Sequence, residues 1–507
     1  MKKKNVSIAI IGAGASGTIL TNQIIEKAYK NLDVSVTVYL IEKGTDFGPG
    51  LAYSTPLSSH ILNMRADTLG IEKDNPLHFM EWLKEQEDSG LGEFSSGMYD
   101  KNYPPRKVYG KYLRYILDTA KKKTGSSQCR LELINGEVVD LEHNGATMHI
   151  KIADGTMISV DYAVLAPGNF PSSFLHELKG IKGYIPYPWP TSVITDNIPR
   201  DYPVCILGTG LSAIDTLFIL LENDHRGEIT FISRRGFLPK VQGEPFDYTL
   251  KYLTKENISN AIAGSNGKNL FFDTIKELYF KEMEASEGEN IDWLKVFNPQ
   301  GSIEQILEKD ISRAEAGIIP YQAALTSTGP MTGYIWNILS ADERMLFDRV
   351  YKTLWTVYRH PMPLINARKI LNALKTGQLD IQSGCSCVRT CGEKGFEIDV
   401  GTRFGIPYTI RIPAVINATG QGLDVTKFNN LLINRLIEKG LINPHPNGGI
   451  FVDFNTSEVI GKYGNRATGL FALGEITRGV HFFTNGIVPN MFSSDRIADY
   501  ILRSGET

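Results

Sequence analysis

The first fifty residues alternate apolar runs with glycine-rich or polar breaks. The β-branched run from Val6 to Ile11 predicts a strand, and the stretch that follows a glycine-rich turn predicts a helix through about Lys27. A second alternating run, Val34 to Ile41, predicts a parallel partner strand that ends in Glu42. The pattern therefore predicts a βαβ unit at the start of the chain.

The turn between this strand and helix reads G-A-G-A-S-G. Its first glycine permits the tight turn, its second lets a pyrophosphate touch the backbone, and its third lets the helix pack closely on the sheet. The helix N-terminus favours a phosphate, and a carboxylate about 25 residues downstream is spaced to bind a ribose hydroxyl. We expect a dinucleotide at Gly12, Gly14, Ala15, Ser16, Gly17, Glu42 and Lys43.

A second copy of this pattern begins at Val204 with V-C-I-L-G-T-G-L-S-A-I-D. It predicts a nucleotide site at Gly208, Gly210, Ser212 and Ala213. The next strand, I-T-F-I-S, ends in Ser233-Arg234-Arg235 instead of a carboxylate. An arginine here suits a 2′-phosphate and favours NADPH over NADH, although Arg234 and Arg235 as merely solvated side chains remain the alternative.

Similar segments close both units. Short alternating runs lie around residues 137–141, 148–152 and 157–165 and end in Ala166-Pro167-Gly168. In the second unit they lie around Leu379, 396–400 and 408–416 and end in Ala418-Thr419-Gly420. The repetition indicates an internal duplication. It predicts an α/β flavoprotein with two Rossmann-like dinucleotide-binding domains, each carrying a β-meander.

The pattern turns helical between Pro239 and Gly377, which predicts an insertion into the second unit. Ser302 with Gln305, and Ser340 with Glu343, have capping-box spacing, and an apolar stripe follows the second box at Leu346, Val350, Leu354 and Val357. The expected organisation is an FAD domain over 1–200 and 421–507, an NAD(P)H domain over 201–240 and 379–420, and a helical insertion over 241–378. Insertions of this kind commonly cover a site.

Composition narrows the class of protein. The chain has 507 residues, 42% of them hydrophobic, and a net charge of −3, which is ordinary for a folded protein and attracts neither nucleic acid nor anionic lipid. No apolar run is long enough to span a bilayer. Lys2 to Lys4 before an apolar run imitate a secretory signal, but cleavage near Ala15 would destroy the glycine turn. The odd number of cysteines favours a reducing compartment, so we expect a soluble, cytoplasmic protein.

Three of the five cysteines form C-x-C-x₃-C. Cys385 and Cys387 are two apart on a predicted strand and therefore expected on one face, while Cys391 lies near a turn. Since no fourth ligand is near, we expect no metal. A disulfide reductase would also need C-x₂-C or C-x₄-C just after the first glycine unit, and the sequence has neither.

Taken together, these motifs resemble the bacterial FAD/NAD(P)-binding protein family, which is related to the class B flavin monooxygenases. The landmarks are G-A-G-A-S-G, G-L-A-Y-S-T-P with H-I-L-N-M, P-P-R-K-V-Y-G-K-Y-L, L-G-T-G-L-S-A-I-D, S-R-R-G-F-L-P, Y-R-H-P-M-P and L-G-E-I-T-R-G. The resemblance covers nearly the whole chain and implies FAD in the first unit and NAD(P)H in the second. Some relatives are N-monooxygenases that oxidise the amine of aspartate toward nitrosuccinate, while many have no assigned reaction.

The resemblance also implies roles for residues outside the glycine turns. The H-I-L-N-M loop would lie beside the flavin, where Asn63 would hydrogen-bond the ring edge, whereas His60 is better explained as a buried loop histidine. Arg106, at the start of a helix, would meet FAD phosphates or the substrate. Gly168, Gly420, Gly474 and Glu475 would approach the cofactors, and the helix that begins near Asn485 would point at the flavin ring.

Arg359 and His360 lie where a helix gives way to a loop before Pro361. Arg359 suits a bidentate clamp on a carboxylate or phosphate, and His360 suits proton transfer near neutral pH. Cations that stabilise a helix C-terminus are the alternative interpretation.

Because the flavin performs the difficult step, the protein needs no catalytic triad. The leading hypothesis is an FAD-dependent, NADPH-consuming monooxygenase that uses O₂, through a flavin hydroperoxide, to hydroxylate the nitrogen of a small polar amine or amino acid. The alternatives are a flavin reductase or dehydrogenase without oxygen insertion, and a non-catalytic nucleotide-binding redox sensor. The substrate and the oligomeric state are left open.

Overall fold

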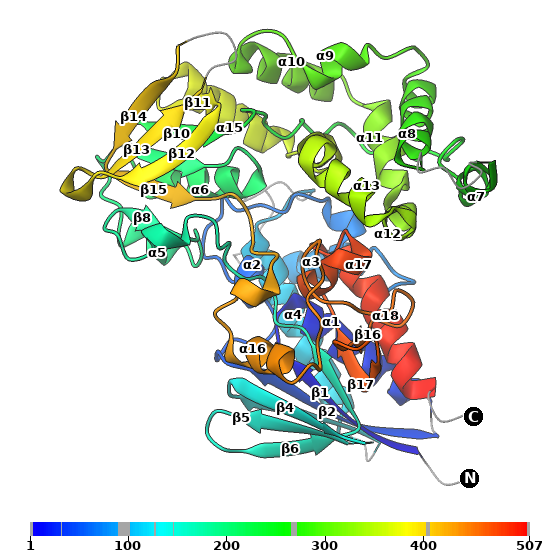
Figure 1. Ribbon diagram of the computed structural model, residues 1–507. Coiled ribbons are helices and arrows are strands. Elements are labelled where there is room, and N and C mark those ends of the chain that lie inside the picture. Colours follow the sequence, from blue (N-terminus) through cyan, green and yellow to red (C-terminus); the bar gives the residue numbers. More distant parts are fainter. Residues whose placement is uncertain are drawn as a thin grey trace. The chain divides into compact units, whose positions relative to one another are not determined.

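The computed structural model describes residues 4–31, 33–89, 102–125, 128–145, 147–264, 271–401 and 406–503 (Figure 1). The chain forms two compact units, one from residues 1–173 with 421–507 and the other from residues 174–420. Residues 174–200, expected in the first domain, thus pack with the second unit. The reason is the short strand β8 (Tyr184–Ile185), which pairs with β15 (Ala414–Asn417).

The first unit is built on a six-stranded sheet in the order β16-β17-β7-β1-β2-β3. These strands are β16 (Glu458–Ile460), β17 (Arg466–Ala472), β7 (Tyr162–Leu165), β1 (Lys4–Ile11), β2 (Val34–Glu42) and β3 (Cys129–Asn135). All neighbours are parallel except β16 and β17. The predicted βαβ start of the chain is confirmed.

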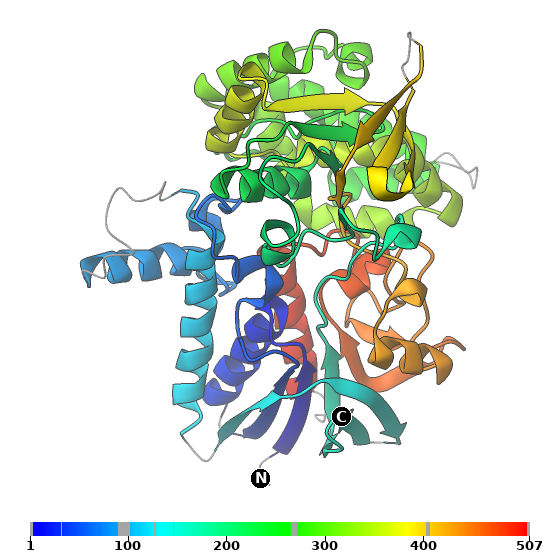
Figure 2. The ribbon, with the colours of Figure 1, turned by 90° about the vertical axis from the view of Figure 1, so that its left-hand side faces the viewer.

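Both faces of this sheet are covered, which explains why β1 is an almost unbroken apolar run. Ile8 and Ile10 pack toward α1 (Ala15–Lys30), α4 (Arg106–Lys123) and α18 (Ile487–Arg503), which lie side by side (Figure 2). Ala9 and Ile11 face the meander β4-β5-β6 and the helix α16 (Leu431–Glu438). The meander strands are β4 (Val138–Asn144), β5 (Thr147–Ile152) and β6 (Met157–Val160).

The second unit repeats this plan and confirms the predicted duplication. Its parallel sheet has the order β11-β10-β9-β15-β8, with β11 (Leu379–Ser383), β10 (Ile229–Ser233) and β9 (Val204–Leu207). The helix α6 (Leu211–Glu222) follows the second glycine turn. The meander consists of β12 (Cys385–Thr390), β13 (Phe396–Val400) and β14 (Tyr408–Ile412).

Helices fill the predicted insertion. They are α7 (Lys255–Gly264), α8 (Phe271–Glu287), α9 (Trp293–Phe297), α10 (Ile303–Glu315), α11 (Pro320–Ser327), α12 (Gly329–Ile338), α13 (Ala341–Leu346), α14 (Lys352–Arg359) and α15 (Leu364–Lys375). Both capping boxes form, at Ser302 and Ser340. The predicted apolar stripe is confirmed only in its second half.

A π-helical turn, Phe347–Tyr351, separates α13 from α14 and shifts the register of the helix. As a result, Leu354 and Val357 are buried but Leu346 is exposed.

The cysteine prediction needs a correction. Ser386 is an extra residue in β12, so that Cys385 pairs with Val400 and Cys387 with Asp399. Because successive residues of β13 point to opposite faces, the bulge places the two cysteines on opposite faces as well. Cys385 packs against the core of the unit and Cys387 is exposed. Within the described residues, no group of three or more His, Cys, Asp or Glu side chains is arranged to hold a metal.

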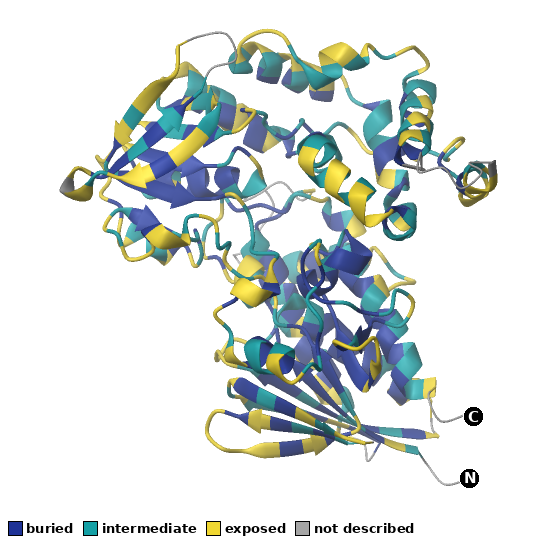
Figure 3. Ribbon diagram, in the orientation of Figure 1, coloured by how far each residue is buried: buried dark blue, intermediate teal, exposed yellow. Residues whose placement is uncertain are grey.

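Buried positions concentrate in the central strands of both units (Figure 3). Among the helices that the structure describes, none is long and apolar enough to cross a membrane.

A buried carboxylate organises the insertion. The side chain of Glu282 on α8 is fully buried and accepts hydrogen bonds from three consecutive backbone N–H groups, those of Lys251, Tyr252 and Leu253, at 2.7–3.1 Å. The Tyr248 hydroxyl donates a fourth bond of 2.7 Å. Burial alone would raise the pKa of Glu282, but these donors outweigh burial and hold the pKa below its ordinary value of 4.5. The carboxylate therefore fixes the loop over residues 248–253.

We predict that Glu282→Gln lowers the free energy of unfolding by about 2–4 kcal/mol, because an amide NH₂ would face backbone donors. Since the pKa of Glu282 is lower in the folded chain, the stabilisation is present above pH 4.5 and is lost as the pH falls through the folded-state value. Urea unfolding at several pH values measures both effects. Glu277→Gln, at an exposed position of the same helix, is the matched control and should change stability by less than about 0.5 kcal/mol. Equal stability of the two variants at neutral pH would contradict this role.

Candidate functional site

The glycine turn after β1 is held by direct backbone contacts. A Cβ on Gly12 would lie 2.1 Å from the Ala166 carbonyl oxygen, and Gly12 has a φ of +109°. A Cβ on Gly17 would lie 2.0 Å from the carbonyl oxygen of Gly12. Both positions therefore require glycine, as predicted from the spacing. The N-terminus of α1 is left close to the ends of β1 and β7, where unpaired N–H groups suit a phosphate.

A second loop, residues 44–50, lies against this turn. The Gly48 N–H donates to the Ala13 carbonyl at 2.8 Å, and a Cβ on Gly50 would lie 2.9 Å from the Gly14 Cα. Asp46 in the loop receives a two-pronged hydrogen bond from Arg114 of α4, at 2.9 and 2.7 Å. The role of this loop was not predicted from the sequence, although its pair of glycines in G-P-G is the signal for it. Two stretches of glycine backbone thus face each other where a pyrophosphate is expected.

Glu42, the carboxylate expected at a ribose, bonds to the backbone of both loops. Its Oε2 accepts from the Ala13 N–H at 2.8 Å and its Oε1 from the Gly44 N–H at 3.2 Å. Each carboxylate oxygen can accept more than one hydrogen bond, so a ribose hydroxyl remains a compatible further donor. The neighbouring Lys43 is exposed.

The C-terminal part of the chain reaches the same place. A Cβ on Gly474 would lie 3.5 Å from Ser16 Oγ, so the turn after β17 lies beside the glycine turn. The following carboxylate, Glu475, is buried. It accepts a 2.7 Å hydrogen bond from the Thr484 hydroxyl and pairs with Arg478 at 3.3 Å. Glu475 thereby ties this turn to the residues that precede α18.

Those residues include a strained turn. Phe482 has a φ of +61° and a ψ of −59°, and the Phe483 N–H donates to the His481 carbonyl at 2.7 Å, which defines a γ-turn with positive φ. His481 is buried and its pKa is lowered to about 3, chiefly by burial, so it stays neutral. Asn485 is exposed, and its amide donates to Gln421 Oε1 at 3.4 Å. The helix begins two residues later, at Ile487.

The H-I-L-N-M loop is fastened by the first residue of α4. The Arg106 N–H donates to the His60 carbonyl at 2.7 Å and its Nε to the Ile61 carbonyl at 3.2 Å. His60 is completely buried, with Nδ1 3.0 Å from the Thr55 hydroxyl, which supports the structural interpretation of this histidine. Asn63 is half-buried.

The second glycine turn is less crowded than the first. Gly208 has a φ of +118°, and a Cβ there would lie 2.7 Å from the Ala418 carbonyl oxygen. Gly210 has open space around it, as have Gly168 and Gly420, which both have positive φ. Ala213, at the position that corresponds to Gly17, is fully buried, and Ser212 is half-buried.

The turn after β10 carries the two arginines. The Ser233 hydroxyl accepts from the Gly236 N–H at 2.9 Å and lies 3.2 Å from the Thr209 hydroxyl of the glycine turn. Arg234 is exposed, while Arg235 is exposed but donates to the Val350 carbonyl at 3.4 Å. The arginine turn and the second glycine turn are therefore connected by side chains.

Arg359 and His360 end α14, as predicted. The Arg359 side chain is half-buried, with Nη2 3.6 Å from where a Cβ of Gly329 would lie, and desolvation lowers the pKa of Arg359. The Tyr279 side chain is close enough to oppose that shift. His360 lies edge-on to Trp355, with ring centroids 5.2 Å apart. Both residues belong to the second unit, whereas Asn63 belongs to the first.

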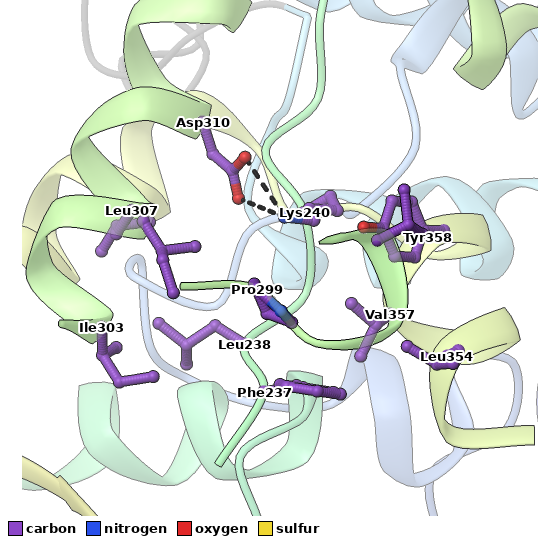
Figure 4. A pocket seen from close by; sticks show the side chains of 12 residues that line it. Phe237, Leu238, Lys240, Pro299, Ile303, Leu307, Asp310, Leu354, Val357 and Tyr358 are labelled. Carbon is purple, nitrogen blue, oxygen red and sulfur yellow. Dashed lines mark hydrogen bonds and ion pairs between the residues drawn. The ribbon is translucent and has the colours of Figure 1, made fainter. Parts of the chain in front are cut away.

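A small pocket opens between the segment that follows Arg235 and the helices α9, α10 and α14 (Figure 4). Its walls are apolar except at one side, where Lys240 pairs with Asp310 at 3.0 Å and lies 5.2 Å from the ring centre of Tyr358. The Lys240 N–H donates to the Val357 carbonyl and the Met362 N–H to the Lys240 carbonyl. The pocket thus lies where the arginine turn is joined to the end of α14.

Comparison with known proteins bears on the N-terminal part of the first unit. Residues 9–170 match the family model described as FAD-NAD(P)-binding. This segment is therefore similar to FAD/NAD(P)-binding domains. A search of curated protein sequences finds no match to the chain.

Solved structures similar to the whole chain confirm its two-domain α/β fold. The FAD-bound cadaverine monooxygenase of desferrioxamine biosynthesis from Erwinia amylovora has a TM-score of 0.57 at 14% identity, over 98% of this chain and 94% of that one. The ornithine N-hydroxylase from Kutzneria sp. 744 has 0.55 at 12%, over 98% and 99%. The L-lysine 6-monooxygenase from Pseudomonas syringae has 0.54 at 14%, over 99% of each chain.

We predict that Gly17→Ala lowers the free energy of unfolding by about 3 kcal/mol or more, because the new methyl group overlaps the Gly12 carbonyl and the turn must shift. The loss should be accompanied by failure to retain a dinucleotide. Gly210→Ala is the matched control, since open space and an ordinary φ of −86° make it tolerable for the fold. Thermal unfolding of the two variants measures the difference in stability. A Gly17→Ala variant as stable as Gly210→Ala would contradict the packing argument.

Proposed function

We propose that the chain is an FAD-dependent, NADPH-consuming monooxygenase that hydroxylates the nitrogen of a small polar amine. The observation that carries the proposal is the pair of glycine turns, one in each unit, of which the first lies in a segment that matches an FAD-NAD(P)-binding family. The similar solved structures, whose names assign them cadaverine, ornithine and lysine as substrates, support the reaction class. Their substrates are all small molecules with a terminal primary amine.

In this proposal FAD binds to the first unit. Gly12, Gly14 and Gly17, with the facing Gly50, give the pyrophosphate access to backbone N–H groups, and Glu42 accepts from a ribose hydroxyl. Gly474 and the end of α18 approach the rest of the cofactor. The remaining proposed FAD contacts are Ala15, Ser16, Lys43, Arg106, Gly168, Glu475 and Asn485. When bound, FAD would supply the redox chemistry with NADPH and O₂, and the protein would supply orientation and electrostatics.

NADPH binds to the second unit. The open backbone at Gly210 admits its pyrophosphate, and Gly208, Ser212, Ala213 and Gly420 surround that position. The exposed guanidinium of Arg234, and that of Arg235, bind the 2′-phosphate that distinguishes NADPH from NADH.

For the substrate, we assign roles to Arg359 and His360 of the second unit and to Asn63 of the first, each considered within its own unit. The half-buried guanidinium of Arg359 suits a bidentate clamp on a substrate carboxylate, because its planar fork matches the two carboxylate oxygens. His360 takes or gives a proton beside it, and Asn63 hydrogen-bonds the edge of the flavin ring. An amino acid satisfies this set better than a diamine, since a diamine offers Arg359 no anion.

We predict that the FAD-loaded protein is reduced by NADPH without oxygen, and that on exposure to O₂ it consumes NADPH, O₂ and a small amino acid in equal amounts and forms a hydroxylamine. Flavin absorbance in a stopped-flow instrument, an oxygen electrode and mass spectrometry of the product measure these quantities. Arg359→Lys keeps the positive charge but cannot make two parallel hydrogen bonds to a carboxylate. The substitution should therefore raise KM for an amino acid more than KM for a diamine. Reduction without any oxidised amine, over a panel of amino acids and diamines, would indicate a reductase instead. Binding of NADPH without reduction would indicate a redox sensor.

We also predict that Arg234→Ala raises KM for NADPH about tenfold to a hundredfold, since it removes a charge-assisted contact of about 1.5–3 kcal/mol. KM for NADH, which has no 2′-phosphate, should barely change and serves as the internal control. Steady-state flavin reduction with each nucleotide gives both values. A parallel loss with NADH would show that Arg234 acts on the fold or on the shared part of the nucleotide.

A further inference from the structure

An aromatic cluster joins three helices of the first unit. Tyr53 ends α2 (Gly50–Tyr53), Trp82 lies on α3 (His78–Asp88), and Tyr109, Tyr112 and Tyr115 follow one another at intervals of three along α4. The rings are in contact. Centroids are 4.9 Å apart for Tyr53 and Tyr109, 5.3 Å for Tyr109 and Tyr112, 5.5 Å for Tyr112 and Trp82, and 5.9 Å for Trp82 and Tyr115. They form a continuous path of oxidisable side chains.

One end of this path is exposed to solvent and the other lies near the glycine turn, an arrangement that core packing alone does not require. Tyr109 and Tyr112 are completely buried and Trp82 is 4% exposed, but Tyr115 is 38% exposed. At the other end, Tyr53 closes the short helix whose first residue, Gly50, lies against Gly14 of the glycine turn. The path therefore runs from the neighbourhood of the dinucleotide site to the surface of the unit.

Tyr112, in the middle of the path, has a base in contact with its hydroxyl. Its hydroxyl oxygen lies 2.7 Å from Nδ1 of His78 and accepts from the Ile71 N–H at 3.4 Å. The other ring nitrogen of His78, Nε2, lies 3.9 Å from Oε1 of Glu72. With its proton on Nε2, His78 accepts from the Tyr112 hydroxyl, and the Glu72 carboxylate lies near the other side of the ring.

This arrangement solves the chemical difficulty of oxidising a buried tyrosine. Burial raises the pKa of the Tyr112 phenol far above its ordinary value, so the group is protonated at neutral pH. A phenol that loses an electron becomes a strong acid, and in a buried site the proton needs an acceptor. His78 can receive it, and Glu72 stabilises the imidazolium that results. The hydroxyl of Tyr109, by contrast, donates to the Leu69 carbonyl at 2.8 Å, which is no base.

We propose that Tyr112 is a redox-active tyrosine and that the ring path through Trp82 to Tyr115 carries oxidising equivalents to the surface. A one-electron oxidant of the class formed by uncoupled oxygen chemistry, such as hydroxyl radical, takes one electron from Tyr112 while the phenolic proton moves to His78. The products are the reduced oxidant, a neutral tyrosyl radical and a protonated His78. A thiol in solution then gives one electron through Tyr115 and Trp82, and becomes a thiyl radical as its own proton passes to water. That electron and the proton from His78 restore Tyr112. The origin of the oxidant at a flavin rests on the proposed function, but the radical site itself does not.

The test supplies its own oxidant. In the FAD-loaded protein, a light flash with tris(bipyridyl)ruthenium and persulfate generates a one-electron oxidant in solution, and electron paramagnetic resonance then identifies the radical formed. Neither NADPH nor turnover is required, so failure of this inference is distinguishable from failure of the proposed function. Wild type should give a neutral tyrosyl signal, which Tyr112→Phe, a substitution that keeps the ring packing, should lose.

Three further variants define the path and the base. His78→Gln keeps an acceptor oxygen but cannot bind the proton, so the tyrosyl signal should be lost although the fold is retained. Tyr115→Phe should slow the appearance of the radical without preventing it. Tyr29→Phe, at an exposed tyrosine of α1 outside the cluster, is the matched control and should behave as wild type. A wild-type signal that survives in Tyr112→Phe or in His78→Gln, or no tyrosyl signal in wild type, would overturn the proposal.

Discussion

The close approach of one backbone to another at the first glycine turn is the constraint on which the rest of the first unit depends. Gly17 lets α1 reach the carbonyl of Gly12, and Gly12 in turn touches the carbonyl that follows β7, at Ala166. Side chains are excluded from these contacts, so the distance between helix and sheet is set by main-chain atoms. Three distant parts of the chain then meet at the N-terminus of α1: the loop over 44–50, the end of β7, and Gly474 after β17. A dinucleotide site assembled in this way needs few side chains of its own.

The second unit shows what changes when the same topology is built less tightly. Gly208 keeps the positive φ and approaches Ala418, but the helix carries Ala213 where the first unit needs Gly17. The strand that follows each helix ends in a polar side chain that accepts a loop N–H. In the first unit this residue is Glu42, and in the second it is Ser233. The change from carboxylate to hydroxyl removes a negative charge just before Arg234. In both units this position therefore accepts a hydrogen bond from a loop N–H, but only in the first unit does it carry a negative charge.

Much of this architecture is readable from the sequence because it is local. The strand, turn and helix at each glycine motif depend on periodicity and on glycines whose spacing has a steric reason, and both capping boxes depend on two side chains three residues apart. The predictions that were wrong are those in which a single residue or one contact between distant segments determines the local structure. A single extra residue, Ser386, reverses the face of Cys387, and a π-helical turn breaks the stripe after Leu346. The pairing of β8 with β15 moves residues 174–200 to the second unit. The loop over 44–50 is not predicted because the contact that places it, between Gly50 and Gly14, joins residues 36 positions apart in the sequence.

The strained turn before α18 shows how the rest of the first unit is used to fix one helix end. A positive φ at a phenylalanine such as Phe482 costs about 1–3 kcal/mol and persists only where surrounding contacts determine it. Here the Phe482 N–H is held by the Arg478 carbonyl at 2.7 Å, and Thr484, two residues on, is held by the buried Glu475. Asn490 on the first turns of α18 then donates to the carbonyls of Thr484 and Gly486 at 3.1 and 2.7 Å. An unstrained loop would have served to connect β17 to a helix. The strain is explained if the position of the α18 N-terminus itself matters, since its unpaired N–H groups carry the positive end of the helix dipole toward the region where the glycine turn and Gly474 come together.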